Sequence, residues 1–323
     1  MERMMWAEQK QFAQDMWEIR ESFSILVETM STQKHTTIET KPSNGPSCLD
    51  GPVTLRTIRR WSKEGNKWAM LTCYDATTAR WMAGAGLPTM LVGDTAAEMI
   101  LGYDSTIHAP LDFLITLTAA VKRGAPDVFV MGDMPFMSYQ VDEPSAIVNA
   151  GKFMTEGTAD AVKLEVDGKW LQRFAAICDA GIAAVAHLGS LPQHSKQTGG
   201  YTTAGRTADA AKTIVDDAIS FEQAGASMLL LEAVPKEVSH AVVEATNIPV
   251  IGCGAGTACH GQVVVMQDLA GMTNWQPAFA APTASLGRDI ANVAKTWMTN
   301  VNNKDLGTHP YDMREGESQR FKG

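Results

Sequence analysis

Residues 161–166 read Ala-Val-Lys-Leu-Glu-Val, an apolar, β-branched run that carries two opposite charges in its interior. In a β-strand successive side chains point to opposite faces, so Lys163 and Glu165 share one face of this run. Strands of a buried parallel sheet are normally apolar on both faces, and a charge there must pair or bind a polar ligand. The run therefore predicts a central strand whose two charged side chains belong to a functional site. The alternative is that these two side chains form a purely structural ion pair.

Five other apolar runs end in an acid or a histidine where a strand should stop. They are residues 70–75, 89–94, 128–133, 183–187 and 228–232, which end in Asp75, Asp94, Asp133, His187 and Glu232. The segments between them have the length of the helical crossovers that join parallel strands. Alternating strands and helices with polar strand C-termini predict an α/β protein with a (β/α)8 TIM barrel, whose chemistry lies on that face.

The remaining elements are predicted from periodicity and turn residues. Helices are expected at 55–65, 76–85, 111–123, 143–156, 207–224 and 286–301. A seventh strand is expected within 249–256, and the eighth, which has the weakest pattern, at 271–279. Long polar loops at 96–110 and after His187 lie where such barrels place substrate specificity, and the second of them is a candidate lid.

Length and composition exclude several classes of protein. The 323 residues suit one barrel plus extensions, and a net charge of −9 with a pI near 5.3 offers no basic face to nucleic acid or anionic lipid. Five cysteines without zinc spacing indicate free thiols in a reducing compartment. The chain has no apolar stretch of the roughly 18 to 20 residues that a membrane span needs. It also has no secretory signal, so we expect a cytoplasmic protein.

The first part of the chain differs from the rest, and we predict an N-terminal extension at 1–51 and the barrel domain at 52–323. Residues 1–30 have the spacing of an amphipathic helix, and residues 31–51 have the composition of a flexible linker. Acidic residues in the helix argue against a mitochondrial presequence. Two interpretations remain: translation begins at Met30, or the helix docks a partner.

The strand-end residues indicate a metal site. Asp94, Asp133 and Glu165 are hard oxygen ligands of the kind that Mg²⁺ prefers, on three strands of one face. Lys163 offers a cation to a substrate carboxylate or a developing enolate. The alternative is a set of unrelated acids at strand ends.

Glu232 ends a wholly apolar strand, where desolvation should raise its pKa toward that of a useful general base. The alternative role is a helix-capping acid before Pro235. His187 can ligate, donate a proton or bond within the core. A divalent cation, a lysine and a separate carboxylate base suit the removal of a proton next to a carbonyl group.

Nine short motifs occur in a fixed order along the chain. They are Val-Gly-Asp at 92–94, Gly-Tyr-Asp-Ser-Thr at 102–106, Arg-Gly-Ala-Pro at 123–126, Asp-Met-Pro-Phe-Met at 133–137, Val-Lys-Leu-Glu at 162–165, His-Leu-Gly at 187–189, Gly-Gly-Tyr at 199–201, Leu-Glu-Ala-Val-Pro at 231–235, and Ile-Gly-Cys-Gly-Ala-Gly at 251–256. Together, over about residues 53–272, they resemble the ketopantoate hydroxymethyltransferase family. Loops depart from its pattern at 166–168, 189–193, 202–205 and 277–279.

The resemblance implies a magnesium-dependent barrel of the phosphoenolpyruvate/pyruvate type. Its reaction transfers a hydroxymethyl group from 5,10-methylenetetrahydrofolate to 3-methyl-2-oxobutanoate, giving 2-dehydropantoate for pantothenate and coenzyme A synthesis. Glu232 would take the proton from C3 of the oxo acid. The resemblance also implies a homo-oligomer, a decamer in the family.

Carried over by position, the family's metal ligands correspond to Asp94 and Asp133, with Glu165 acting on the metal through water. Lys163, the two aspartates and Thr95, which stands where the family usually has serine, would bind the oxo acid. Two other functions stay open: a Mg²⁺-dependent carbon–carbon lyase or mutase on another 2-oxo acid, and a non-catalytic barrel that serves as a scaffold.

Overall fold

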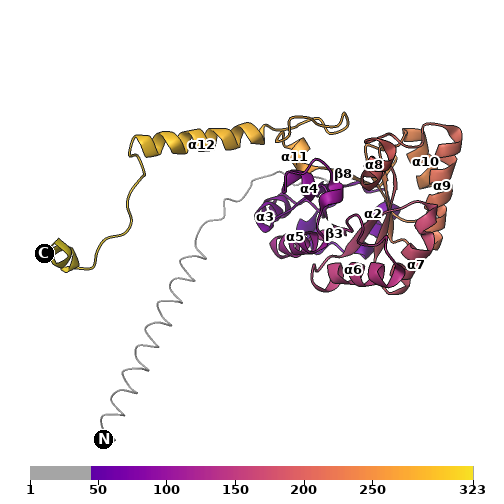
Figure 1. Ribbon diagram of the computed structural model, residues 1–323, viewed down its shortest axis with the longest axis horizontal. Helices are drawn as coiled ribbons and strands as arrows, with labels where there is room; N and C mark the ends of the chain where they lie inside the picture. Colours follow the sequence, from indigo (N-terminus) through magenta and orange to yellow (C-terminus); the bar gives the residue numbers. More distant parts are fainter. Residues whose placement is uncertain (1–44, 323) are drawn as a thin grey trace, which may run out of the picture. The chain divides into compact units, whose positions relative to one another are not determined.

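The structure, a computed structural model that describes residues 45–322, is built around a closed barrel of parallel strands (Figure 1). Neighbouring strands pair in chain order, and β1 also pairs with β8, which closes the sheet. The strands are β1 (Trp68–Thr72), β2 (Thr89–Val92), β3 (Phe129–Asp133), β4 (Ala161–Glu165), β5 (Ala184–Gly189), β6 (Met228–Glu232), β7 (Val250–Cys253) and β8 (Gly261–Val264). The predicted TIM barrel is confirmed.

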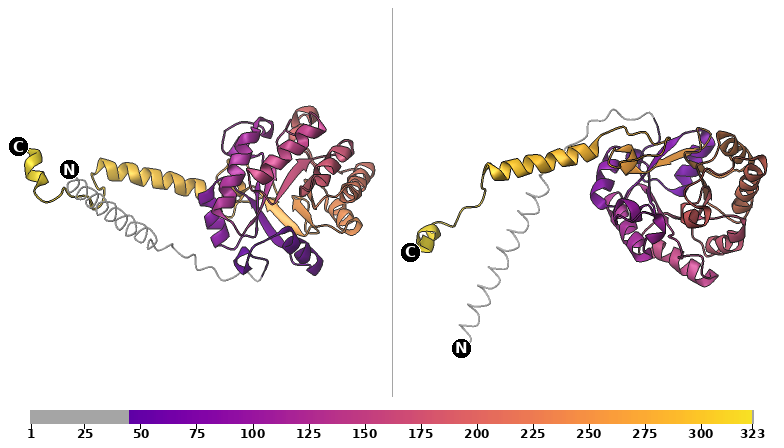
Figure 2. Two further views of the ribbon diagram at one scale, coloured as in Figure 1. Left: turned by 90° about the horizontal axis from the view of Figure 1, so that it is seen from below. Right: turned by 45° about the horizontal axis from the view of Figure 1, so that its top comes forward.

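Helices cover the outside of the barrel, as Figure 2 shows, and leave the strands at its centre. The longer helices are α2 (Leu55–Glu64), α3 (Ala76–Gly84), α5 (Leu111–Gly124), α6 (Glu143–Thr155), α7 (Leu171–Asp179), α9 (Ala208–Gln223), α10 (Lys236–Ala245) and α12 (Leu286–Asn302). Short helices include α4 (Ala96–Met99), α8 (Ser195–Thr198), α11 (Met266–Leu269), α13 (Glu317–Lys322) and the 3₁₀ turns η1 (Cys48–Asp50), η2 (Thr106–His108), η3 (Gly168–Trp170) and η4 (Pro192–His194). The six predicted helices occur within two residues of their expected ends.

The first helices begin where the sequence supplies side-chain caps. Thr54 and Thr57 bond each other's backbone N–H at the start of α2, and Gly65 ends that helix in the left-handed conformation. Asp75 caps α3, since its carboxylate accepts from the N–H groups of Thr77 and Thr78, both at 2.8 Å. The sequence pattern places Asp75 among the acids that end strands. In the structure β1 ends three residues before Asp75, so this acid has a local structural role as a helix cap.

The prediction of the eighth strand at 271–279 is wrong. The strand is β8, Gly261–Val264, ten residues earlier, and it pairs with β1 so that Trp68 lies opposite Gly261. Its four residues alternate in burial and include an exposed Gln262, so it lacks the continuous apolar run that marks a central strand. A glycine is required at 261 because a Cβ there would lie 2.5 Å from the Trp68 ring.

The charged strand β4 occupies the position that its sequence predicts. All five of its residues are buried, with Lys163 and Glu165 only 4% and 1% exposed. Its register places Lys163 beside Asp133 of β3, and Glu165 beside His187 of β5. In a closed barrel the side chains that point inward at the strand C-termini meet in one region, which brings these polar groups together.

The predicted N-terminal helix, residues 1–30, lies outside the described residues. At the end of the range predicted as a linker, η1 contacts the barrel: Cys48 is buried, and its N–H donates to the Gly86 carbonyl at 3.3 Å. The boundary between residues 51 and 52 stays a prediction. Within 45–322, none of the helices has both the length and the apolar character needed to cross a membrane.

Candidate active site

A cavity of about 620 Å³ opens at the C-terminal ends of the strands. The six predicted site residues line it together with His187, whose role the sequence left open, although they come from five different strands or the loops that follow them: Asp94, Thr95, Asp133, Lys163, Glu165, His187 and Glu232. The other lining side chains are mainly apolar or aromatic, as expected for a small-molecule site. The barrel therefore brings the predicted set into one place.

Lys163 is the cation at the floor of the cavity. Its Nζ lies 2.8 Å from Asp133 Oδ1 and 3.2 Å from His187 Nδ1. Burial favours the neutral amine, but the charges of Asp133, Glu165 and Asp94 outweigh it and raise the pKa of Lys163. The ammonium is thus held charged and pointed into the site.

Three buried acids surround this one ammonium. The Asp94 N–H donates to Asp133 Oδ2 at 3.1 Å, which places the two aspartates side by side. Burial raises the pKa of all three acids, and repulsion from Asp133 adds to the rise at Asp94, while repulsion from Asp94 adds to it at Glu165. Glu165 Oε1 is buried without a hydrogen-bond partner. The arrangement carries an excess of negative charge that a divalent cation would neutralise.

The geometry suits a cation held by two carboxylates. In the described part of the chain, no group of three or more His, Cys, Asp or Glu side chains is preassembled around one metal position. Mg²⁺ commonly takes only one or two protein carboxylates and completes its shell with water and substrate oxygens. Asp94 and Asp133 fit that pattern as direct ligands, with Glu165 as an outer acid.

His187 lies between Lys163, at the acid cluster, and the carboxylate of Glu232. Burial, together with the adjacent Lys163, lowers the pKa of this histidine well below its usual value, so the ring is neutral. Nδ1 faces the ammonium and must accept, which leaves the proton on Nε2. That nitrogen lies 3.5 Å from Glu232 Oε2 and makes no hydrogen bond within the described residues.

Glu232 ends β6 with its side chain 24% exposed toward the cavity. Burial raises its pKa to about 7, since the partial compensation from Lys163 is smaller than the cost of desolvation. The capping alternative is wrong, because α10 begins after Pro235 with no side-chain cap. Glu232 is therefore a carboxylate poised to exchange protons near neutral pH.

Gly93 and Thr95 shape the loop that follows β2. The Thr95 hydroxyl is hydrogen-bonded to the Tyr74 hydroxyl. A Cβ at Gly93 would lie 2.9 Å from Thr95 Oγ1, so the glycine makes room for this threonine side chain.

Comparison with known proteins gives the family. The family model for ketopantoate hydroxymethyltransferase matches residues 52–309. The chain is 41% identical over 262 residues to 3-methyl-2-oxobutanoate hydroxymethyltransferase of Mycobacterium ulcerans (strain Agy99), covering 80% of this chain and 88% of that protein. It is 42% identical over 254 residues to the enzyme of the same name from Rhodococcus jostii (strain RHA1), covering 78% and 86%. The chain belongs to the ketopantoate hydroxymethyltransferase family.

Solved structures with this fold come from enzymes of other names. A 2,3-dimethylmalate lyase of the PEP mutase/isocitrate lyase superfamily aligns with a TM-score of 0.54 at 16% identity, covering 84% of this chain and 98% of that one. A phosphonopyruvate hydrolase aligns with a TM-score of 0.55 at 10% identity, covering 83% and 91%. At these identities the likeness shows the barrel fold alone, and the family assignment to the ketopantoate hydroxymethyltransferases rests on sequence.

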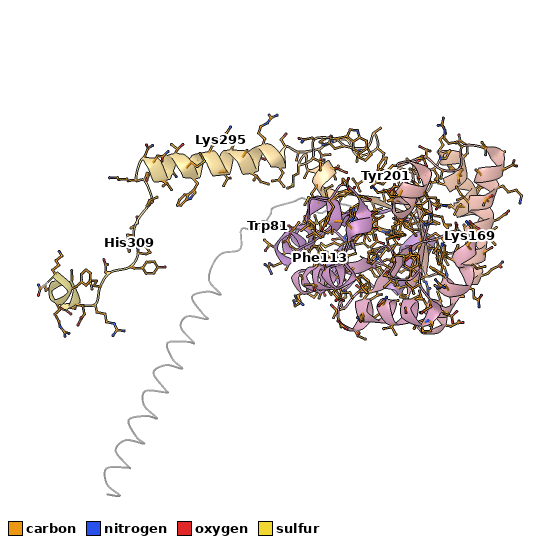
Figure 3. The ribbon with its side chains drawn as sticks, in the orientation of Figure 1. Trp81, Phe113, Lys169, Tyr201, Lys295 and His309 are labelled. Carbon is orange, nitrogen blue, oxygen red and sulfur yellow. The ribbon has the colours of Figure 1, made fainter. Side chains whose placement is uncertain are left out.

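The site also contains side chains that the strand-end pattern did not single out. Gln193 lies buried in η4 and bonds two of the acids, and Tyr139 bonds Gln193. Tyr201, labelled in Figure 3, donates to Glu98 of α4 at 3.1 Å and joins the loop after β5 to the loop after β2. None of these side chains ends a strand, so the strand-end signal could not find them.

Proposed function

We propose that this chain transfers a hydroxymethyl group from 5,10-methylenetetrahydrofolate to C3 of 3-methyl-2-oxobutanoate. With one water consumed, the products are 2-dehydropantoate and tetrahydrofolate. The family membership and the printed names of the relatives support the choice of reaction. The observation that carries the mechanism is that Glu232, with a pKa of about 7, faces the same cavity as Lys163 and the acid pair.

The acid cluster would hold Mg²⁺ through Asp94 and Asp133. The fit is supported by three buried acids against one ammonium and by the unpartnered Glu165 Oε1. Bound there, the cation would act as a Lewis acid toward the 2-oxo group of the substrate. Lys163, fixed by Asp133, would bind the negative oxygen that develops as the C3 proton leaves.

Glu232 would accept the proton from C3. A base with a pKa near the working pH combines a useful ionised fraction with sufficient basicity. His187 Nε2 lies 3.5 Å from Glu232 Oε2, and because its ring is neutral it places no positive charge beside this carboxylate. The carbon nucleophile then forms a bond to the one-carbon unit, whose two C–N bonds to the folate break; water supplies the hydroxyl group, and its other proton and the proton from C3 end on the two nitrogens of tetrahydrofolate.

The outer half of the cavity is suited to a flat heterocycle. Four aromatic side chains line it and are partly exposed: Tyr103, Tyr201, Trp275 and Phe279. Aromatic faces offer stacking surfaces to a planar ring, and the pterin of a folate is such a ring. This lining supports the folate as the one-carbon donor.

The test is exchange of the C3 hydrogen of 3-methyl-2-oxobutanoate in deuterated buffer, followed by proton NMR without folate. We expect Mg²⁺-dependent exchange, which Glu232→Gln lowers by about 10²- to 10⁴-fold, since a general base contributes that much. Oxo-acid binding should persist in the variant. Glu237→Gln, an exposed site on α10, is the matched control and should exchange normally.

Absence of C3 exchange in the unaltered protein would overturn the proposal. Product formation with methylenetetrahydrofolate distinguishes the transferase from a lyase or mutase on another 2-oxo acid, since those reactions do not consume a folate. A scaffold without activity would show neither exchange nor product. The presence of all seven site residues around the cavity favours a catalyst over that scaffold.

We further propose that the chain forms a homo-oligomer, for which the resemblance suggests a decamer. Helix α12 carries an apolar stripe with helical spacing that is exposed in the single chain: Leu286, Ile290, Val293, Trp297 and Val301. Such a stripe normally packs against another apolar surface. A second copy of this chain is the occupant we propose, and a monomeric mass by light scattering would contradict it.

We also propose a cytoplasmic location. All five cysteines are free thiols, and burial, which disfavours the thiolate, raises the pKa of each: Cys48, Cys73, Cys178, Cys253 and Cys259. Unpaired thiols are typical of a reducing compartment. Recovery of the native protein in a membrane or secreted fraction would contradict this location.

A further inference from the structure

Gln193 crosses the mouth of the barrel and contacts the ends of three other strands. It lies in η4, after β5, and is only 3% exposed. Its Nε2 donates to Asp94 Oδ2, beyond β2, at 2.9 Å and to the Met134 carbonyl, beyond β3, at 3.0 Å. Its backbone N–H donates to Glu165 Oε2, at the end of β4, at 2.9 Å.

The orientation of the Gln193 amide is determined by its neighbours. A carboxylate and a backbone carbonyl can only accept, so the NH₂ group must face Asp94 and Met134. The amide oxygen then faces the Tyr139 hydroxyl at 2.9 Å, and this hydroxyl also lies 2.8 Å from the Glu165 carbonyl, so the two acceptors share its one proton. Tyr139 is itself 1% exposed, and its ring packs edge-on against Trp170 at 6.1 Å. The contact network therefore runs from a packed aromatic pair through the Gln193 amide to Asp94, while the Gln193 backbone N–H reaches Glu165.

We propose that Gln193 is a positioning residue that aims Asp94 and Glu165 at the cation, with Tyr139 holding its amide in place. This inference rests on the proposed function, because it concerns the same metal site. In the described contacts Gln193 makes no hydrogen bond to Glu232. Its role is to act through the two carboxylates.

The bonding pattern explains how one residue can prepare both acids. At Asp94, one carboxylate oxygen bonds the amide, which limits rotation of the group and leaves Oδ1 for a ligand. At Glu165, the backbone N–H takes Oε2, while Oε1 is left without a partner. Outer residues that orient metal ligands in this way commonly alter metal affinity by about 10- to 100-fold when they are changed.

The test is Gln193→Leu, which keeps the size of the side chain, removes the amide that bonds Asp94 and leaves the backbone N–H that bonds Glu165. Gln197→Leu in α8 is the matched control, since Gln197 is exposed and makes no side-chain hydrogen bond in the described structure. Binding of Mn²⁺, as a probe for Mg²⁺, is titrated by electron paramagnetic resonance without substrate. We expect Kd to rise about 10- to 100-fold for Gln193→Leu and to stay unchanged for the control.

Two further measurements separate positioning from a general structural effect. Saturating Mg²⁺ should restore most of the C3 exchange rate of Gln193→Leu, whereas a misfolded site would stay inactive. Tyr139→Phe removes the hydroxyl that faces Gln193 Oε1 and the Glu165 carbonyl, and it should weaken Mn²⁺ binding about 2- to 10-fold, the usual contribution of one donated proton. Its effect should be smaller in the Gln193→Leu background, because the tyrosine acts through the glutamine.

Each result bears on a different claim. Equal Mn²⁺ affinity in the unaltered protein and in a folded Gln193→Leu variant would overturn the inference. Additive effects of the two substitutions would overturn the part assigned to Tyr139. If Gln193→Leu does not fold, the Mn²⁺ affinity of Tyr139→Phe becomes the deciding measurement. An unaltered affinity in Tyr139→Phe would then overturn the proposed network. Failure of the unaltered protein to bind Mn²⁺ would instead overturn the proposed metal site.

Discussion

The rate of C3 exchange is expected to rise with pH through a midpoint set by Glu232. This carboxylate must be ionised to accept a proton, and burial raises its pKa from 4.5 to about 7. A group with that pKa is about 9% ionised at pH 6 and about 91% at pH 8, so the rate should change roughly tenfold. With the ordinary value of 4.5 the group would be about 97% ionised at pH 6, and the rate would barely change.

Bound Mg²⁺ would lower this midpoint, since a nearby cation favours the ionised carboxylate. The midpoint is therefore expected between 4.5 and 7, with the full rate on its alkaline side. Exchange is followed by proton NMR from pH 5 to pH 8, with Mg²⁺ shown to be saturating at each pH. A rate that varies by less than about 1.5-fold over this range would refute the assignment of Glu232 as a base of raised pKa.

Two other substitutions test the site and the barrel. Asp133→Asn should weaken Mg²⁺ binding, measured by calorimetry, by more than the roughly 10- to 100-fold typical of an outer residue, and unaltered affinity would refute the ligand assignment. Gly132→Ala in β3 would place a Cβ 2.5 Å from the buried Phe153 ring, and such overpacking should lower the free energy of unfolding by about 1–3 kcal/mol. Its matched control is Gly151→Ala in α6, where a Cβ meets nothing within 4 Å and should stabilise the protein by about 0.5–1 kcal/mol. Equal unfolding midpoints for the two alanine variants in urea would contradict the packing argument.

The residues that end strands could be predicted from the chain because their signal is local. An apolar run followed by an acid appears in the sequence whatever the rest of the fold does, and parallel strands of a barrel present their C-termini on one face. Asp94, Asp133 and Glu232 were found in this way, and Lys163 and Glu165 through the charged strand. Asp75 shows the limit of the signal, since an acid after a strand can equally cap the next helix.

The misplaced eighth strand has a different cause. The four residues of β8 close the barrel by pairing with β1 and β7, so their strand conformation depends on partners far away in the chain. A strand this short offers little periodicity, and the longer stretch at 271–279 was favoured although it forms no strand. Two of its aromatic side chains, Trp275 and Phe279, line the cavity instead.

Local pattern was enough for the alternation of strands and helices, the charged strand and the acids at the strand ends, because each depends on residues near one another in the chain. The role of Gln193 could not be read in that way. Its bonds reach Asp94, Met134 and Glu165 across separations of 99, 59 and 28 residues. Such contacts exist only after the barrel has closed and the loop after β5 has crossed its mouth, because folding, not sequence spacing, brings these groups within hydrogen-bond distance.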